Sequence, residues 1–269
     1  MAISDFLFVQ REIPGIDPQF VAEFFGTPIA SSTMTVTLIT LATLVFGIWF
    51  KRRIAIQPGT TQIVTEMAAD GLSDLTQQIT GSNKHFHRML PVITAIFVYL
   101  VVANLITYIP GITSFTVDGT PVFGSPTADF NTTFGLALGA VIALQIVSLQ
   151  TFGVVGHIKK YIPIHNVIAG FKKGIGAGFT SLIDIFVGIL DIIGEFAKVI
   201  SLSLRLFGNM LAGNILATVL LGAFAFGIPS IWLGFNLLVG VLQALVFAAL
   251  VGGYYMLAID GEPEEPSTA

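Results

Sequence analysis

The chain has 269 residues, of which 54% are hydrophobic and only 10% are charged, and its mean hydropathy is +0.86. A water-soluble domain carries about 25% charged residues, so this composition excludes a soluble protein and indicates a membrane protein. The absence of cysteine excludes disulfides and thiolate metal sites, and a net charge of −4 points to no particular partner.

Residues 1–29 contain no basic region followed by an apolar core, so we predict an external N-terminal segment without a signal or transit peptide. A first membrane crossing is predicted over about 30–50, and it stops at three basic residues, Lys51, Arg52 and Arg53. In the following stretch, 54–88, the apolar residues recur with helical periodicity. We interpret it as an amphipathic helix on the cytoplasmic membrane surface.

Four further apolar segments follow, each long enough for a bilayer that takes about 20 residues. The second and third crossings are predicted over 89–110 and 131–156, separated by a loop rich in Gly, Pro and Ser. Segments 175–228 and 230–258 provide the last two. The fold class is therefore an all-α membrane protein with about five crossings, a single helical domain over 30–259 and an acidic cytoplasmic tail over 260–269.

Basic residues set the predicted orientation. They concentrate in two loops, at 51–53, 84 and 88 and at 159, 160, 172 and 173, whereas Arg11 alone falls on the opposite side. Cytoplasmic loops of membrane proteins carry the excess of Lys and Arg. We therefore place the N-terminus outside and the C-terminus in the cytoplasm.

The segment 175–228 carries charges on one side of its predicted helix. At about 100° per residue, its charged residues and one amide share a strip narrower than about a quarter of the helix; they are Asp184, Asp191, Glu195, Lys198, Arg205 and Asn209. Glu195 and Lys198 are three residues apart, so they can form a structural ion pair instead of serving transport.

Arg205 has no such neighbour. The nearest acidic residue on its helix is Glu195, about 15 Å away along the axis. An arginine at the centre of a membrane helix costs about 2.5–3.5 kcal/mol on insertion scales, so water or a carboxylate of another subunit must stabilise it. Its guanidinium stays protonated and would lower the pKa of a carboxylate that passes it.

The sequence around this arginine, SLSLRLFGNMLAGN at 201–214, resembles the signature of subunit a of the F-type ATP synthase. NLITYIP at 104–110, SPTADFNTTFGLALG at 125–139 and LQALVF at 242–247 resemble further segments of that family. The resemblance implies that the last two helices form a long tilted hairpin against a ring of c subunits. It implies that Arg205 is the essential arginine, with Asn209, Gln243 and an outer-mouth aspartate, Asp129, as further path residues. Asp191 and Glu195 match acidic positions on the cytoplasmic side.

Two positions depart from the family pattern. Where the family usually has an ionisable Glu or His, this chain has Asn214 and Asn236, which cannot titrate near neutral pH. One hypothesis is that Asp129 supplies the titratable group while the two asparagines hold a water chain. The alternative is that the asparagines bond to each other across the hairpin, and Gln243 can likewise form a simple interhelical hydrogen bond.

The implied function is that of an ion-translocating stator subunit with two proton half-channels. The outer half-channel would involve Asp129, Asn214, Asn236 and Gln243, the inner one Asp184, Asp191 and Glu195, and Arg205 would separate them. The implied partners are the c-ring, the peripheral stalk b subunits and the rest of the ATP synthase complex in a lipid bilayer. The bilayer is a bacterial inner membrane or, alternatively, the inner membrane of an organelle.

No catalytic role is expected of this chain. GIGAG at 174–178 lacks the Lys-Ser/Thr of a phosphate loop, so we expect no bound nucleotide, and no cofactor, metal or nucleic acid is predicted. The histidines at 85, 87, 157 and 165 are predicted to lie near lipid headgroups.

The competing function is a self-contained secondary transporter, but we find no internal repeat in the sequence. A non-conducting scaffold would have no use for the aligned charges, and the sequence leaves proton and sodium coupling open.

Overall fold

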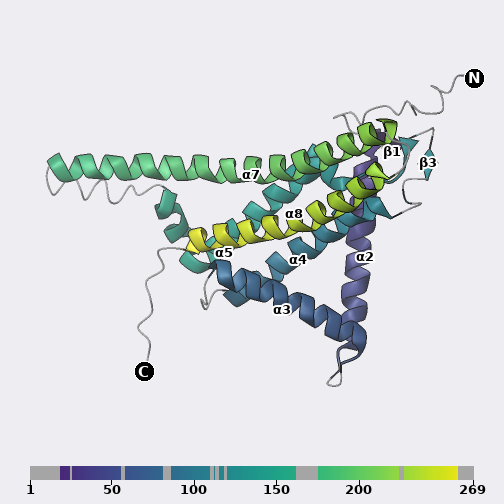
Figure 1. The fold of residues 1–269 in the computed structure, drawn as a ribbon. Helices are drawn as coiled ribbons and strands as arrows, with labels where there is room; N and C mark the ends of the chain where they lie inside the picture. The colour runs from purple at the N-terminus through teal and green to yellow at the C-terminus, as the bar shows by residue number, and fades with distance from the viewer. Residues whose placement is uncertain are drawn as a thin grey trace, which may run out of the picture.

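The computed structural model describes residues 19–24, 26–55, 58–80, 86–109, 112, 115–117, 120–161, 175–223 and 227–259. The predicted acidic tail, 260–269, and residues 1–18 of the predicted external segment lie outside them. The helices are α2 (Ser31–Arg53), α3 (Thr60–Thr80), α4 (Phe86–Leu105), α5 (Phe130–Tyr161), α7 (Ile175–Ala223) and α8 (Ile228–Ile259), with 3₁₀ turns η1 (Ile106–Tyr108) and η3 (Pro126–Ala128). Figure 1 shows α7 as a long helix beside α8, and both helices cross α2 at a large angle.

Four of the helices are long and apolar enough to cross a membrane: Ser31–Arg53, Met89–Tyr108, Phe130–Val154 and Ile228–Ala258. They match four of the five predicted crossings. The remaining predicted crossing lies in α7, which has 49 residues and carries the aligned charges. At about 1.5 Å per residue α7 is about 74 Å long, more than twice the thickness of a bilayer core, so it passes through one only at a steep tilt.

Short strands add to the helices at one end of the bundle. β1 (Phe20–Phe24) pairs with β2 (Thr27–Ala30), and β3 (Thr116–Val117) pairs with β4 (Thr120–Pro121), both antiparallel. Gly26 supplies a positive φ of 77° in the first turn, a conformation that costs glycine little. The loop predicted between the second and third crossings therefore contains β3, β4 and η3, and the chain is all-α only in its membrane part.

The core forms where α4, α5, α7 and α8 pack together. Its fully buried members include Leu100 of α4, Leu144 of α5, Leu206 of α7 and Phe247 of α8. α8 runs antiparallel to both α4 and α7, and α5 runs antiparallel to α7, as the edge-to-face contact of Phe130 with Phe207 shows (ring centroids 5.7 Å apart). The hairpin of the last two helices is thus present.

The predicted surface helix is confirmed as a helix over Thr60–Thr80. It packs against α4 and α8, and it buries Gln62, Leu72 and Thr76. Its exposed side includes Ile63, Val64 and Met67 as well as acidic residues. The helix therefore presents apolar side chains beyond those that the bundle covers, as an amphipathic surface helix requires.

α5 bends sharply at Gly153, whose φ of 69° and ψ of 168° are not helical. The chain then turns back: Tyr161 Oη donates a hydrogen bond to Gln145 Oε1 at 3.1 Å, although the two residues are 16 apart. In a straight helix that separation would be about 24 Å. The predicted third crossing therefore ends at the bend, and residues 154–161 form a separate, folded-back segment.

Candidate functional site

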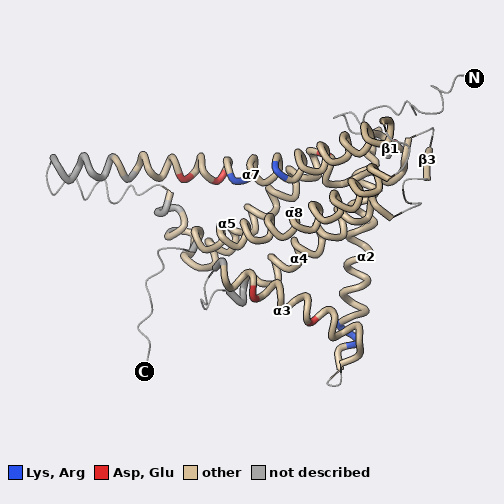
Figure 2. The backbone as a smooth tube through the Cα atoms, viewed as in Figure 1, with Lys and Arg blue, Asp and Glu red and all other residues tan. Residues whose placement is uncertain are grey.

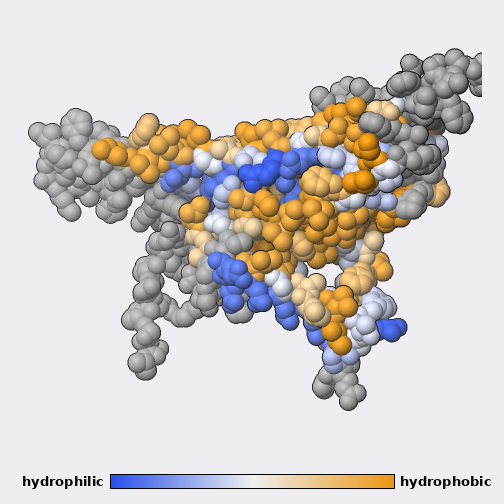
Figure 3. All heavy atoms as spheres, in the orientation of Figure 1, coloured by the Kyte–Doolittle hydropathy of each residue, from blue (hydrophilic) through white to orange (hydrophobic). Residues whose placement is uncertain are grey.

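The charged residues of α7 lie along one edge of the helix, as the sequence predicted (Figure 2). Lys198 Nζ and Glu195 Oε1 are 2.7 Å apart, so the predicted ion pair is confirmed. Lys198 also lies over the ring of Tyr254 of α8, 5.2 Å from its centroid. Asp191 is exposed on the same edge, and Asp184 belongs to α7 although its side chain lies outside the described residues. Figure 3 shows the result as a hydrophilic strip within an apolar surface.

Arg205 lies further along this edge and is half-buried. Its Nη2 donates a weak hydrogen bond to Ser201 Oγ at 3.4 Å. Among the residues that the structure describes, no carboxylate lies within 4.0 Å of the guanidinium. The charge therefore lacks an anionic partner within the described chain, which agrees with the prediction that its partner comes from elsewhere.

Asn209 and Gln243 are brought together across the α7–α8 hairpin. Asn209 Nδ2 donates to Gln243 Oε1 at 2.7 Å, and Gln243 is only 5% exposed. This is the interhelical hydrogen bond that the sequence left open as an alternative role. Gln243 Nε2 has no hydrogen-bond partner among the residues that the structure describes, so this amide can still bind a water molecule or a passing ligand.

Asn236 lies deeper in the same hairpin, at 2% exposure, with its side chain directly against Gly213 of α7. The Gly213 carbonyl also accepts a hydrogen bond from Trp232 Nε1 at 3.1 Å. No hydrogen bond joins Asn214 to Asn236 in the described part of the hairpin, and the Asn214 carbonyl accepts one from Thr218 Oγ1 at 3.0 Å. The hypothesis that the two asparagines bond to each other is therefore not supported, and Asn236 Nδ2 is left without a protein partner.

This close approach gives a testable expectation. In Gly213→Ala the new methyl group would lie 2.7 Å from Asn236 Nδ2 and closer still to its Oδ1, so the buried Asn236 side chain must move or the two helices must separate. We expect a loss of about 1–3 kcal/mol of stability, as for other overpacked cores. It would be measured as a lower temperature at which the chain leaves the purified complex.

Gly139→Ala of α5 is the matched control, because no atom of the described residues lies within 4 Å of its added carbon and α5 is outside the proposed ring contact. It is expected to leave the stability unchanged. Equal stability of Gly213→Ala and Gly139→Ala would contradict the packing described for Gly213.

Asp129 caps the start of α5. Its Oδ1 accepts a hydrogen bond from the Asn131 backbone N–H at 2.9 Å, and its Oδ2 accepts one from the Ser32 hydroxyl of α2. The preceding turn, η3, packs against α2, α4, α5 and α7. Asp129 is thus held at the junction of these helices, and Phe130 next to it contacts Phe207, two residues past Arg205.

Several polar residues near this junction escaped the sequence analysis as site candidates. Asn104 of α4 is fully buried and donates from Nδ2 to the Gly240 carbonyl of α8 at 2.7 Å, while its Oδ1 has no partner. The Tyr108 hydroxyl and Thr127 Oγ1 are also buried without a hydrogen bond. Leaving such a group unpaired costs about 1–3 kcal/mol, so these atoms fit a hydrated polar seam. The sequence did contain a signal for Asn104, because its amide lies inside the apolar segment NLITYIP at 104–110.

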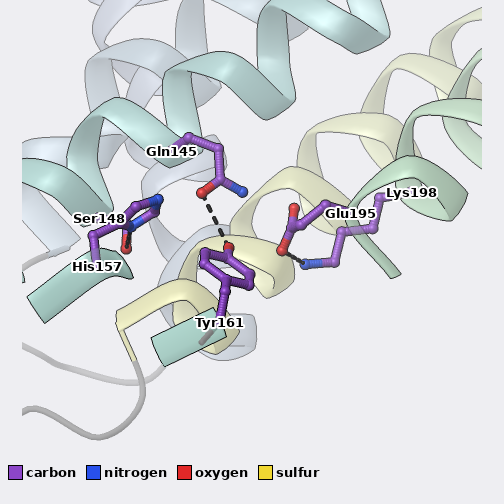
Figure 4. A network of polar contacts seen from close by, with 6 residues as sticks. All are labelled: Gln145, Ser148, His157, Tyr161, Glu195 and Lys198. Carbon is purple, nitrogen blue, oxygen red and sulfur yellow. Dashed lines mark hydrogen bonds and ion pairs between the residues drawn. The ribbon is translucent and has the colours of Figure 1, made fainter. Parts of the chain in front are cut away.

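A second polar cluster lies at the other end of α5 (Figure 4). A cavity of about 430 Å³ between α5 and α7 is lined mainly by apolar residues, with Gln145, His157, Tyr161 and Glu195 as its polar members. His157 Nδ1 lies 3.0 Å from Ser148 Oγ. The bend at Gly153 turns the His157 ring toward Ser148, and its placement near lipid headgroups stays a prediction.

Comparison with known proteins places these residues in a family. The family model described as ATP synthase A chain matches residues 32–256. The chain belongs to this ATP synthase A chain family. The matched region includes every candidate site residue from Asp129 to Gln243.

Named members of the family cover most of the chain. An ATP synthase subunit a of Desulforamulus reducens is 36% identical over 239 residues, which is 85% of this chain and 79% of that protein. A protein of Propionigenium modestum named ATP synthase subunit a, sodium ion specific, is 29% identical over 94% of this chain and 79% of its own length. A subunit a of Picosynechococcus is 27% identical over 89% of this chain and 90% of its own length. As an ATP synthase A chain, the protein is an integral membrane subunit that works in a complex with other ATP synthase subunits.

Proposed function

We propose that this chain is the ion-translocating stator subunit of the rotary ATP synthase, with two proton half-channels separated by Arg205. The observation that carries the proposal is the half-buried guanidinium without a carboxylate partner in the described chain. Such a charge in a membrane helix needs a partner, and a ring carboxylate that arrives and leaves would be one. The chain itself does no ATP chemistry.

The exposed side of α7 supports a ring as that partner. Leu204, Gly208, Ala212 and Leu216 are exposed and follow one another every four residues, all within about 100° of Arg205 around the helix. An apolar strip of this kind marks a surface that lipid or another protein covers. Gly208 is open over its Cα, which lets a partner helix approach closely. We propose that the c-ring packs here and that the b subunits of the peripheral stalk hold the chain still.

The outer half-channel begins at Asp129 and continues past Asn214, Asn236 and Gln243. Asn104 and Tyr108 extend the same polar seam, because their buried atoms lack protein partners. A proton would pass from Asp129 along water held by these amides to a ring carboxylate. Once neutral, that carboxyl group can enter the lipid phase, and the ring turns.

The inner half-channel is formed by Asp184, Asp191 and Glu195. A ring carboxylate that reaches this side loses its proton to water in the channel, and Arg205 then holds it ionised as it passes. Each proton releases about 2.3 kcal/mol per 100 mV of membrane potential, so several must cross for each ATP. The excess of Lys and Arg in two loops supports a cytoplasmic position for this side and an external N-terminus, in a bacterial inner membrane or, alternatively, with the corresponding sides of an organelle inner membrane.

The runner-up is a secondary transporter that acts alone. Transport by the purified chain in liposomes separates the two functions, with and without added sodium ions. We expect no ion flux through the lone chain, and coupled proton flux when it is purified with the ring and the peripheral stalk. Substrate-coupled transport by the lone chain would refute the stator proposal.

A further inference from the structure

The 154–161 segment is held in place by contacts on both sides. Toward α5 it is tied by the bonds of His157 to Ser148 and of Tyr161 to Gln145. Toward α7 the Tyr161 carbonyl oxygen lies against Gly188, at a place where any β carbon would collide with it. The segment therefore fixes the His157 ring at one wall of the cavity, 5.2 Å from the Tyr161 ring and edge to face with it.

Glu195 lies on the opposite wall of the same cavity, from α7. A volume of about 430 Å³ is enough for several water molecules, and four polar side chains can hold water there. His157 and Glu195 are thus two titratable side chains that share one partly open, mainly apolar cavity. Figure 4 shows Tyr161 between them.

The other titratable groups around His157 do not compete with it near neutral pH. Burial raises the pKa of the Tyr161 phenol, the Gln145 hydrogen bond opposes this rise, and the Glu195 and Asp191 carboxylates add to it, so the phenol stays protonated. Lys198 is paired with Glu195 and lies over Tyr254 of α8. The side chains of Lys159 and Lys160 lie outside the described residues. Histidine is the side chain whose charge ordinarily changes between about pH 5 and 8.

We propose that His157 is a proton-transfer residue at the cytoplasmic end of the inner half-channel. During ATP-driven pumping the imidazole takes a proton from cytoplasmic water, becomes imidazolium and gives the proton to cavity water, which passes it to the Glu195 carboxylate. During synthesis the proton moves in the reverse direction, and the ring returns to its neutral form in each cycle. This inference rests on the proposed stator function and adds a residue to its inner half-channel.

The test compares ATP-driven pumping of His157→Gln and the unaltered complex in inverted vesicles, where the cytoplasmic side faces the medium. Dividing the two rates at each pH removes the pH dependence of the other subunits, because they are identical in both. We expect the ratio to fall to about one tenth between about pH 6 and 7.5 and to recover toward pH 9, where histidine is rarely protonated. A ratio that does not change with pH would overturn the proposal.

Two variants keep the test decisive. Tyr161→Phe removes the other polar contact of the segment but no group that titrates in this range, so its ratio should be flat with pH. Ser148→Ala keeps the histidine and removes its hydrogen bond, so the midpoint of the pH dependence should shift. If His157→Gln does not assemble, an unshifted midpoint in Ser148→Ala overturns the proposal. Normal pumping by an Arg205→Ala complex would instead refute the stator function itself.

Discussion

Replacing Arg205 by alanine is expected to abolish ATP-driven proton pumping in inverted vesicles while the complex remains assembled. The side chain makes one weak hydrogen bond, to Ser201, and no ion pair within the described chain, so its loss removes little of the structure of the subunit. What it removes is the fixed positive charge that, in the proposed function, holds a ring carboxylate ionised between the two half-channels. Pumping would be followed by a pH-sensitive dye and assembly by co-purification of the ring.

Two further variants sharpen this expectation. Arg205→Lys keeps a positive charge but gives up the planar guanidinium, and lysine loses its proton more readily in an apolar site, so we expect strongly reduced pumping. Arg53→Ala is the matched control, because Arg53 is an exposed arginine that lies over Trp49 at the end of α2. It should pump normally. Normal pumping by Arg205→Ala as well would mean that the charge is structural.

Asp129→Asn separates two roles of one side chain. Asparagine is as good an N-cap as aspartate, so the bond to the Asn131 N–H and the start of α5 should persist. Ser32 can turn its hydroxyl from donor to acceptor toward the new amide. The change thus removes only the charge and the titration, and we expect pumping to slow by more than about tenfold if Asp129 transfers protons.

The control for this variant is Asp129→Ala, which loses the cap as well as the charge. Removing such a cap costs about 1 kcal/mol, so its thermal stability should drop while that of Asp129→Asn stays unchanged. Undiminished pumping by Asp129→Asn would show that the carboxylate serves α5 alone. The outer half-channel would then have no titratable group among its proposed members.

The sequence predicted the helices well because apolar length is a strong signal. The crossings of α2, α4, α5 and α8 and the Glu195–Lys198 pair all follow from spacing of three or four residues or from runs of about 20. Arg205 was recognisable for a similar reason, since a charge among apolar residues is conspicuous in one dimension. The pairing of Asn209 with Gln243 joins residues 34 apart and was only one of two open possibilities.

What the sequence could not give depends on backbone geometry and long-range contact. Gly153 is one of 28 glycines, and nothing local distinguishes it as the point where α5 reverses and carries His157 inward. The extent of α7 (Ile175–Ala223) was close to the predicted segment 175–228, but its steep crossing of α2 depends on packing that the sequence does not show. Asn104 and Tyr108 became candidates only when the structure showed Asn104 Oδ1 and the Tyr108 hydroxyl buried with no hydrogen-bond partner among the described residues.

The steep tilt of α7 has a geometric consequence for the rotation of the proposed ring. Glu195 and Asn209 are 14 residues apart, or about 21 Å along the axis. On a helix parallel to the membrane normal, the whole of that distance would be a difference in depth within the membrane. An ion could then cover it without moving sideways. On a helix laid across α2 as in Figure 1, much of it becomes displacement parallel to the membrane plane. The two proposed half-channels then open at different positions around the ring. An ion can therefore pass from one to the other only when the ring rotates.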